Sequence, residues 1–295
     1  MKDFHKIKGA KASLFAILAA SLYAINSPIS KLLLIELSPT MMAALLYIGA
    51  GIGLTIIVGV KKSIGKETKE LPLAKRDLPY TIGMIVLDIV APILLMIGLK
   101  FQAASNASLL NNFEIVATSI IAMCIFKEVI SKRLWIGIFF ITLSSIILTI
   151  DDISSFSFSI GSLFVLLACI CWGFENNCTR KISERNPLQI VIIKGFFSGI
   201  GSLIIAVILR EITTNIGYIF MALCLGFVAY GLSILFYIYA QRDLGAAKTS
   251  AYYAIAPFIG ALLSLIIFRE IPSISFLIAL IIMLIGTYYT TTDQK

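Results

Sequence analysis

Three carboxylates and one ammonium group lie inside long apolar stretches of the sequence. Asp88 and Glu114 are each twelve to fourteen residues from the nearest flanking Lys or Arg, so both lie near the middle of their stretches. Glu175 and Lys194 lie nearer the ends, with their backbones about 8 Å and about 10 Å deep. Ionisable groups buried in apolar segments are costly and commonly mark binding sites or proton pathways. These four side chains are therefore the first candidates for chemistry.

Each of these residues also has a structural interpretation. Asp88 and Glu114 can each make a single hydrogen bond between helices, and Glu175 can form an ion pair with Lys194 at similar depth. In the functional interpretation, Asp88 and Glu114 face a cavity, where they bind a cation or exchange a proton. Glu175 then faces the cavity beside Trp172, and Lys194 holds it charged or competes with the substrate for it. Glu114 is then the preferred site of proton coupling, because the only histidine, His5, lies in the leading tail.

Amide and aromatic side chains accompany the acids. Asn111 precedes Glu114 by three residues and shares its helix face, so we expect both to point into the cavity and Asn112 to pack against a neighbouring helix. A desolvated cation over an aromatic ring gains about 2 kcal/mol. The candidate rings for such a contact are Tyr23, Trp172, Tyr230, Tyr252 and Tyr253.

No residue pattern indicates catalysis or a bound cofactor. The sequence contains no HExxH, no GxSxG and no phosphate-binding loop. Its five cysteines form no CxxC pair, so we expect them to pack as small apolar residues and not to bind a metal or form disulfides. We therefore expect no enzyme, no cofactor and no metal site. The alternatives from another class are a membrane scaffold without transport activity and a membrane enzyme.

The composition indicates that the lipid bilayer is the solvent. Of the 295 residues, 59% are hydrophobic and 14% are charged, which is too apolar for a water-soluble core. The net charge of +8 does not predict a nucleic-acid partner, because the basic residues lie between apolar runs instead of forming a patch beside exposed aromatics. The expected partners are a small-molecule substrate and the bilayer, and the sequence leaves the oligomeric state open.

Ten apolar stretches are long enough to cross a membrane, which takes about 20 residues. They lie near residues 12–35, 40–60, 78–99, 103–126, 134–150, 160–179, 188–209, 216–240, 246–268 and 273–290. The connectors between them are too short to form a soluble domain. The predicted fold class is thus an all-α integral membrane protein with ten transmembrane helices.

Basic residues in the connectors predict the orientation of these helices. With the N-terminus in the cytoplasm, 19 of the 24 Lys and Arg residues lie on the cytoplasmic side, four lie outside, and Lys194 lies within a span. We predict a multi-pass protein of the plasma membrane with both termini in the cytoplasm. Lys66 and Asp152 are then on opposite sides of the membrane.

The sequence repeats itself once. The fourth predicted span ends in Ile125–Glu128 and the ninth in Ile267–Glu270, two similar runs 142 residues apart, and at an offset of 149 Tyr23 matches Trp172. Each half holds five spans, an odd number, so the second half enters the membrane from the opposite side. Such inverted repeats are typical of secondary carriers, whose substrate site lies near the midplane between the halves. The predicted halves are residues 1–152 and 153–295.

With these features the chain resembles the EamA-type carriers of the drug/metabolite transporter superfamily over nearly its whole length. The resemblance rests on the order of short motifs: aromatics at Tyr23 and Trp172, Pro39 and Pro187 opening the second and seventh helices, Glu128 and Glu270 after the fourth and ninth, and the small-residue run from Ala107 to Glu114. Ile115 replaces the proline that the family places after this run, whereas Pro257 keeps it in the ninth span. This replacement argues against the bend that is standard in the fourth helix of the family. The resemblance implies alternating access without ATP, often for export.

The residues and the resemblance together predict a secondary active transporter of a small organic solute. Three carboxylates against Lys194 favour an organic cation or quaternary amine, and the run Trp172-Gly173-Phe174-Glu175 is similar to the sixth span of choline-transporting members. The alternative is an exporter of neutral amino acids or related metabolites, because similar cores carry such solutes and protonated acids would remove the charge argument. The direction of transport and its coupling to protons or another cation are left open.

Overall fold

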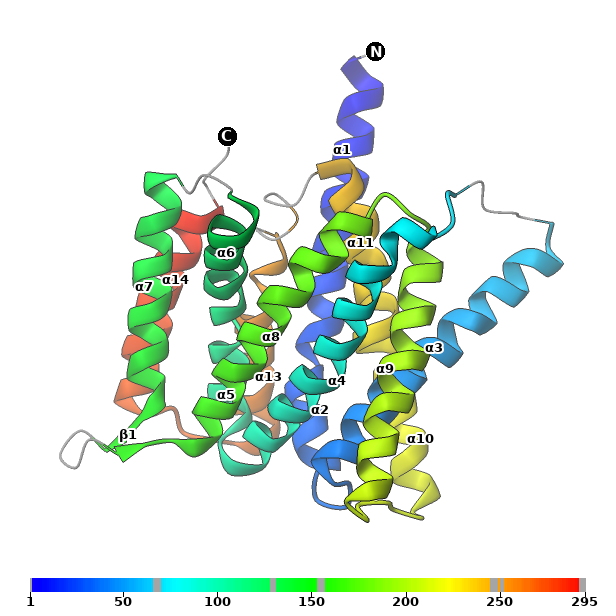
Figure 1. Ribbon diagram of the computed structural model, residues 1–295. Coiled ribbons are helices and arrows are strands. Elements are labelled where there is room, and N and C mark those ends of the chain that lie inside the picture. The colour runs from blue at the N-terminus through cyan, green and yellow to red at the C-terminus, as the bar shows by residue number, and fades with distance from the viewer. Residues whose placement is uncertain are drawn as a thin grey trace.

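The computed structural model describes residues 2–65, 70–127, 131–152, 157–244, 249 and 252–291. Nearly all of them form one bundle of helices (Figure 1). In the first half the helices are α1 (Lys2–Ala24), α2 (Asn26–Leu33), α3 (Pro39–Ser63), α4 (Leu78–Phe101), α5 (Ala104–Leu110), α6 (Phe113–Phe126) and α7 (Lys132–Thr149). In the second half they are α8 (Ile160–Ile182), α9 (Pro187–Ile208), α10 (Ile216–Leu225), α11 (Ser233–Leu244), α13 (Ala256–Phe268) and α14 (Ile274–Thr291).

Four short elements lie between these helices in the described part of the chain. A 3₁₀ turn, η1 (Lys75–Asp77), precedes α4, and a π-helical segment, η2 (Gly226–Leu232), joins α10 to α11. Between α7 and α8 the chain forms a small antiparallel pair of strands, β1 (Ile150–Asp152) and β2 (Ser157–Phe158). These strands lie at the predicted junction of the two halves. The division at residue 152 itself stays a prediction.

The helices agree with the ten predicted spans. Eight helical stretches in the described residues are long and apolar enough to cross a membrane, and the last two, Ala256–Phe268 and Ile274–Thr290, are shorter apolar helices. Helices α1 and α2 together form the first span, α5 and α6 the fourth, and α10, η2 and α11 the eighth. The predicted all-α, ten-helix membrane fold is confirmed.

Local sequence signals set where several helices begin. The hydroxyl of Ser38 accepts a hydrogen bond from the Met41 amide, and Pro39 opens α3. The side chain of Asn186 accepts hydrogen bonds from two amides at the start of α9, where Pro187 is the first residue. Such caps satisfy amides that have no partner inside the helix, and proline at the first position has the backbone angle that a helix needs.

The helices pair as an inverted repeat requires. Three contacts join equivalent spans of the two halves: α3 with α9, α5 with α13, and α7 with α14. The third span contacts the sixth through α4 and α8. The eighth span contacts the first in the same way, through α11 and α1, as the repeat requires. Figure 1 shows α7 and α14 side by side at one edge of the bundle, and α3, α9 and α10 at the other.

Glycines allow α3 to approach two neighbours closely. A Cβ atom on Gly195 of α9 would lie 2.5 Å from the backbone nitrogen of Gly51 on α3, which leaves no room for a side chain. On another face of α3, a Cβ atom on Gly49 would collide with the backbone of Leu223 in α10. Small residues permit such close helix contacts in membranes, where packing supplies much of the association energy. Helix α3 is thus clamped between α9 and α10.

A turn interrupts the fourth span even though Ile115 replaces the family proline. Helix α5 ends at Leu110, and the amides of Asn112 and Glu114 bond to carbonyls three residues back, at 3.2 and 3.1 Å, as in a 3₁₀ turn. The ninth span has a turn one residue beyond the equivalent place, at Ala254–Ile255, just before Pro257. The missing proline therefore does not keep the fourth span continuous, and the expectation about a bend of its axis stays a prediction. The turn instead contains two asparagines, whose amides compete with helical backbone hydrogen bonds.

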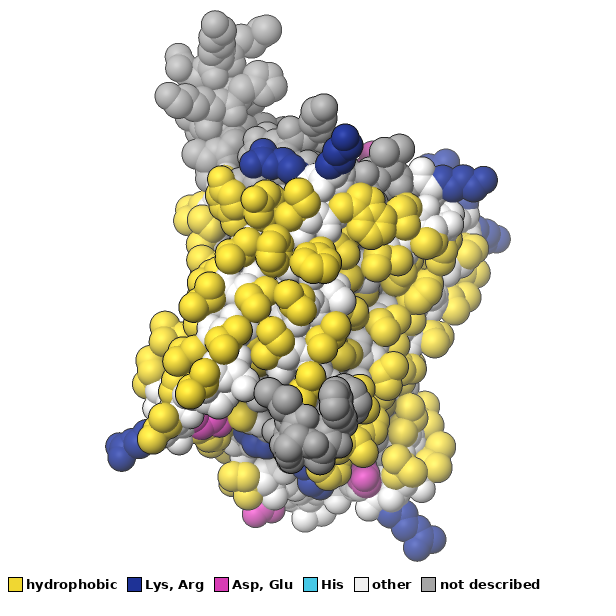
Figure 2. Space-filling view, turned by 90° about the vertical axis from the view of Figure 1, so that its left-hand side faces the viewer, with side chains coloured by type: hydrophobic (Ala, Val, Ile, Leu, Met, Phe, Trp, Pro, Cys, Tyr) yellow, Lys and Arg dark blue, Asp and Glu magenta, His cyan; other side chains and the backbone are white. Residues whose placement is uncertain are grey.

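The outer surface of the bundle is apolar between its two ends. Figure 2 shows hydrophobic side chains covering the middle of the face formed by α7 and α14, with charged side chains near the top and bottom. Large exposed side chains on these helices include Trp135, Phe139, Leu277, Ile281 and Leu284. A surface of this kind would be unfavourable in water and fits a lipid environment.

Candidate functional site

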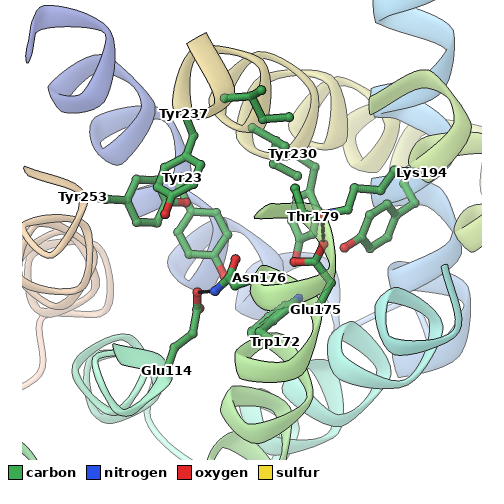
Figure 3. A pocket seen from close by; sticks show the side chains of 13 residues that line it. Tyr23, Glu114, Trp172, Glu175, Asn176, Thr179, Lys194, Tyr230, Tyr237 and Tyr253 are labelled. Carbon is green, nitrogen blue, oxygen red and sulfur yellow. Dashed lines mark hydrogen bonds and ion pairs between the residues drawn. The ribbon is translucent and has the colours of Figure 1, made fainter. Parts of the chain in front are cut away.

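A cavity lies between the two halves of the bundle (Figure 3). A water-sized sphere can move within about 70 Å³ of it, and the space measures about 600 Å³ when the open solvent at its mouth is included. The wall is formed by helices α1, α3, α6, α8, α9 and α11, the segment η2 and Tyr253, which precedes the turn before α13. The lining residues are Tyr23, Tyr47, Glu114, Trp172, Glu175, Asn176, Thr179, Lys194, Tyr230, Ile234, Tyr237, Ile238 and Tyr253.

Aromatic rings form much of this wall. The ring of Tyr23 lies 6.0 Å from that of Tyr230 and 5.7 Å from that of Tyr253, measured between centroids. Tyr47 meets Tyr230 edge-on at 5.0 Å, and Tyr237 meets Tyr253 in the same way. Rings at these distances and angles interact favourably, so they hold one another in place. The π-helical segment η2 positions Tyr230, and segments of this kind frequently occur at functional sites.

Glu114 enters the cavity from the start of α6. Its Oε1 atom accepts a hydrogen bond of 2.6 Å from the side-chain amide of Asn176 on α8. No ion pair joins Glu114 to a basic residue in the described part of the chain. Figure 3 shows its carboxylate on the side of α8 that also holds Tyr23 and Tyr253.

A second cluster of charged side chains lies across the cavity and consists of two carboxylates and one ammonium group. The Lys194 Nζ atom is 2.8 Å from Glu175 Oε1 and 3.1 Å from Asp88 Oδ2. The hydroxyl of Thr179 donates to Glu175, and that of Tyr47 donates to Asp88 Oδ1 at 2.6 Å. All of these side chains are buried. We call Asp88, Lys194 and Glu175 the charged triad.

The repeat places an uncharged version of this arrangement on the opposite side. At the offset of 149, Asn26 is equivalent to Glu175 and Ser30 to Thr179, and at the offset of 142, Tyr230 is equivalent to Asp88. The Ser30 hydroxyl donates to Asn26 at 3.0 Å, and the Asn26 amide donates to the Tyr230 hydroxyl at 3.3 Å. The two halves thus build similar contacts, but only one of them carries charge.

Six of the nine predicted site residues line the cavity: Tyr23, Glu114, Trp172, Glu175, Tyr230 and Tyr253. Asp88 lies behind the wall, fully buried beneath Lys194. Asn111 is buried against α8, with its Oδ1 atom 4.0 Å from the Sγ atom of Cys169. Tyr252 is exposed and does not line the cavity.

Asn111 and Glu114 still face the same helix. Asn111 approaches Cys169 and Glu114 contacts Asn176, both on α8, but only Glu114 reaches the cavity. Asn112 is buried, as a packing residue would be, but neither polar atom of its side chain has a hydrogen-bond partner among the described residues.

Several lining residues were not among the predicted site residues. Tyr47 and Tyr237 are single tyrosines in otherwise apolar helices, and nothing in their neighbourhood distinguishes them from packing residues. Thr179 follows Glu175 by four residues, a spacing that brings two side chains together on a helix. Lys194 was expected to pair with Glu175 or to compete with the substrate for it. Its contact with Asp88 joins α4 and α9 in a way that sequence spacing does not reveal.

Comparisons with known proteins agree with this architecture. The EamA-like transporter family matches residues 10–150 and, a second time, residues 159–292. An uncharacterized transporter of Methanothermobacter thermautotrophicus is 28% identical over 95% of this chain and 85% of its own length. The uncharacterized transporter YyaM of Bacillus subtilis is 24% identical over 77% of this chain and 76% of its own. A protein of known crystal structure has the same fold, with a TM-score of 0.69 over 95% of both chains at 14% identity.

Proposed function

Because the chain belongs to the EamA-like transporter family, we propose that it carries a small organic cation, such as a quaternary amine, by alternating access. Membership of the family makes the protein a multi-pass membrane transporter. The side chains that line the cavity indicate which kind of solute the protein carries.

The observation that supports a cation is the excess of carboxylates around the cavity. The site contains three carboxylates, on Glu114, Glu175 and Asp88, but one ammonium group, on Lys194. Lys194 already contacts Glu175 and Asp88. Glu114 has an amide as its partner and keeps its charge uncompensated when ionised. A cleft with an excess of one charge attracts ligands of the opposite sign and repels those of the same sign. An organic anion is therefore disfavoured.

The aromatic wall supports a quaternary amine in particular. Such a cation has no N–H group to donate, so a protein binds it chiefly through ring faces and nearby negative charge. Trp172 and the five tyrosines of the wall offer these faces from both halves of the bundle. Tyr23 and Trp172, equivalent residues of the repeat, both take part.

Thermal unfolding of the purified protein with a panel of solutes tests this proposal. The panel contains choline, betaine, polyamines, guanidinium and neutral amino acids. Choline at one hundred times its dissociation constant should stabilise the protein by about 2.7 kcal/mol and raise Tm by several degrees. Glu175→Gln and Trp172→Ala should reduce this shift strongly. The matched control is Glu36→Gln, which changes an exposed acid outside the cavity.

Uptake of radiolabelled choline into proteoliposomes completes the test, because it measures transport directly. Saturable counterflow of choline is the expected result. The proposed cargo would be wrong if amino acids alone stabilised the protein and if Glu175→Gln and Trp172→Ala left that stabilisation unchanged.

A zwitterionic amino acid is the second candidate, because the cavity presents a cation as well as acids. Lys194 lines the wall beside Glu175 and can meet a carboxylate, while Glu114 can meet an α-ammonium group. Amino acids in the panel separate the two candidates. A zwitterion would require Lys194 for binding, whereas a simple cation would not.

A further inference from the structure

Lys194 occupies a position where a bound cation would compete with it. Its ammonium group contacts Glu175, which lines the cavity, and Asp88, which lies behind the wall with no exposed surface. A solute that enters the cavity can reach Glu175 but not Asp88. A solute can therefore replace Lys194 at Glu175, whereas Asp88 keeps Lys194 as its partner.

The fold of the bundle does not itself require these charges. In the other half, Asn26 and Tyr230 occupy the positions equivalent to Glu175 and Asp88, and they join the same kinds of spans through a neutral hydrogen bond. Removing charges from water is costly, and a buried ion pair often stabilises a fold no better than apolar residues would. A charged triad beside a cavity, opposite a neutral counterpart, thus points to a role in transport.

We propose that Lys194 is a tethered cation that pairs with Glu175 in the empty carrier and yields it to the incoming substrate cation. This inference rests on the proposed function, because only a cationic substrate would replace the ammonium at Glu175. After the exchange, Lys194 stays with Asp88, whose other oxygen holds the Tyr47 hydroxyl. Among the described residues, the only hydrogen-bond or ion-pair partner of Asp88 Oδ2 is Lys194.

The exchange has a consequence for the transport cycle. Glu175 has a cationic partner both when the site is loaded and when it is empty, so neither state carries this carboxylate unpaired through the membrane. An unpaired buried charge is strongly unfavourable. Lys194 therefore permits the empty carrier to return, which net transport needs and solute exchange does not.

Two variants test this role in proteoliposomes, with choline as the probe. In Lys194→Met, net efflux of choline into choline-free buffer should fall at least about tenfold, because the empty carrier cannot return. Counterflow should continue, with a half-saturation concentration lowered roughly tenfold, because nothing competes for Glu175. Lys194→Arg keeps the charge and should restore net efflux. A purely structural role for Lys194 would reduce both kinds of flux together.

Asp88→Asn shifts the competition in the opposite direction. Lys194 then has Glu175 as its only carboxylate, holds it more tightly, and should raise the half-saturation concentration of choline counterflow roughly tenfold. The amide can still accept the Tyr47 hydroxyl, so this variant also decides the matter if Lys194→Met does not fold.

The outcomes separate this inference from the proposed function. If the wild-type protein moves neither choline nor another cation of the panel, the proposed cargo and this role of Lys194 both fail. If it moves choline, equal loss of net efflux and counterflow in Lys194→Met overturns the role of Lys194 alone. An unchanged or lower half-saturation concentration in Asp88→Asn does the same.

Discussion

Glu114 and Glu175 differ in their partners. Asn176 donates a neutral hydrogen bond to Glu114, whereas Glu175 meets the ammonium group of Lys194 at 2.8 Å. A carboxylate paired with a cation must break that pair to take up a proton. Glu114 breaks no ion pair when it is protonated, which makes it the better candidate for proton exchange.

Replacing Glu114 with Gln should therefore separate coupling from translocation. A pH gradient should no longer drive choline transport in proteoliposomes, because Gln cannot carry a proton across. Choline counterflow should persist at saturating concentration, with weaker apparent affinity. Glu36→Gln should leave both activities as in the wild type, since Glu36 is exposed at the end of the first span. Undiminished pH-driven flux in Glu114→Gln would rule out Glu114 as the coupling site.

For single residues, the sequence was informative where a residue type is rare in membrane-spanning segments. Acids in the middle of apolar stretches stand out, and Glu114 and Glu175 both line the cavity. Tyrosines are common in membrane helices, so nothing separated Tyr47, which lines the cavity, from Tyr252, which is exposed and does not line it. The difference depends on the rotation of each helix, which packing sets.

At the scale of the helices, the close contact between α3 and α9 connects packing to the site. Tyr47 of α3 and Lys194 of α9 both contact Asp88, and Gly195 follows Lys194 directly. The backbone of Gly51 lies so close to Gly195 that no side chain fits between them. Because Asp88 of α4 holds one contact to each of these helices, a separation of α3 from α9 would break at least one of the two.

Gly195→Ala should destabilise the protein, because its methyl group would lie within 2.5 Å of the Gly51 backbone. Overpacking of this kind costs about 1–3 kcal/mol, which should lower Tm by several degrees and reduce choline transport. Gly59→Ala is the matched control, since no atom lies within 4 Å of a Cβ atom there. Alanine is a better helix former than glycine, so this control should equal or slightly exceed the wild type in Tm. Equal Tm values for the two variants would contradict the close contact.

The breaks within spans were harder to predict than the spans. A proline is a visible signal, and Pro257 does follow a turn in the ninth span. The fourth span has the same turn without a proline, and the π-helical segment η2 has no marker in the sequence. Both features depend on how neighbouring helices satisfy the backbone, which local propensity does not contain.

At the scale of the whole molecule, the repeat and the apolar lengths made the architecture predictable. Hydropathy gave the ten spans because lipid leaves few alternatives to a helix. Each half has an odd number of spans, so the second half had to cross the membrane in the opposite direction. The pairing of α3 with α9 and of α7 with α14 could not be read from the sequence, since many pairings are compatible with the same spans.

The orientation in the membrane can be tested with single cysteines in a variant that lacks the five native ones. Lys62→Cys at the end of α3 and Thr214→Cys before α10 lie at exposed positions, at opposite ends of the bundle. The excess of basic residues predicts that Lys62→Cys is cytoplasmic and that Thr214→Cys faces outward. In intact cells, a membrane-impermeant maleimide should therefore label only Thr214→Cys. Labelling of Lys62→Cys alone would mean that the orientation is reversed.

The position of Trp172 has a consequence for optical measurement. The chain contains two tryptophans, and the other one, Trp135, lies 46% exposed on the apolar face of α7, away from the cavity. In a Trp135→Phe background, all tryptophan emission would come from one indole ring in the cavity wall. A solute arriving beside that ring would change its intensity or colour without any attached dye. The protein thus contains a built-in fluorescent reporter of its own occupancy.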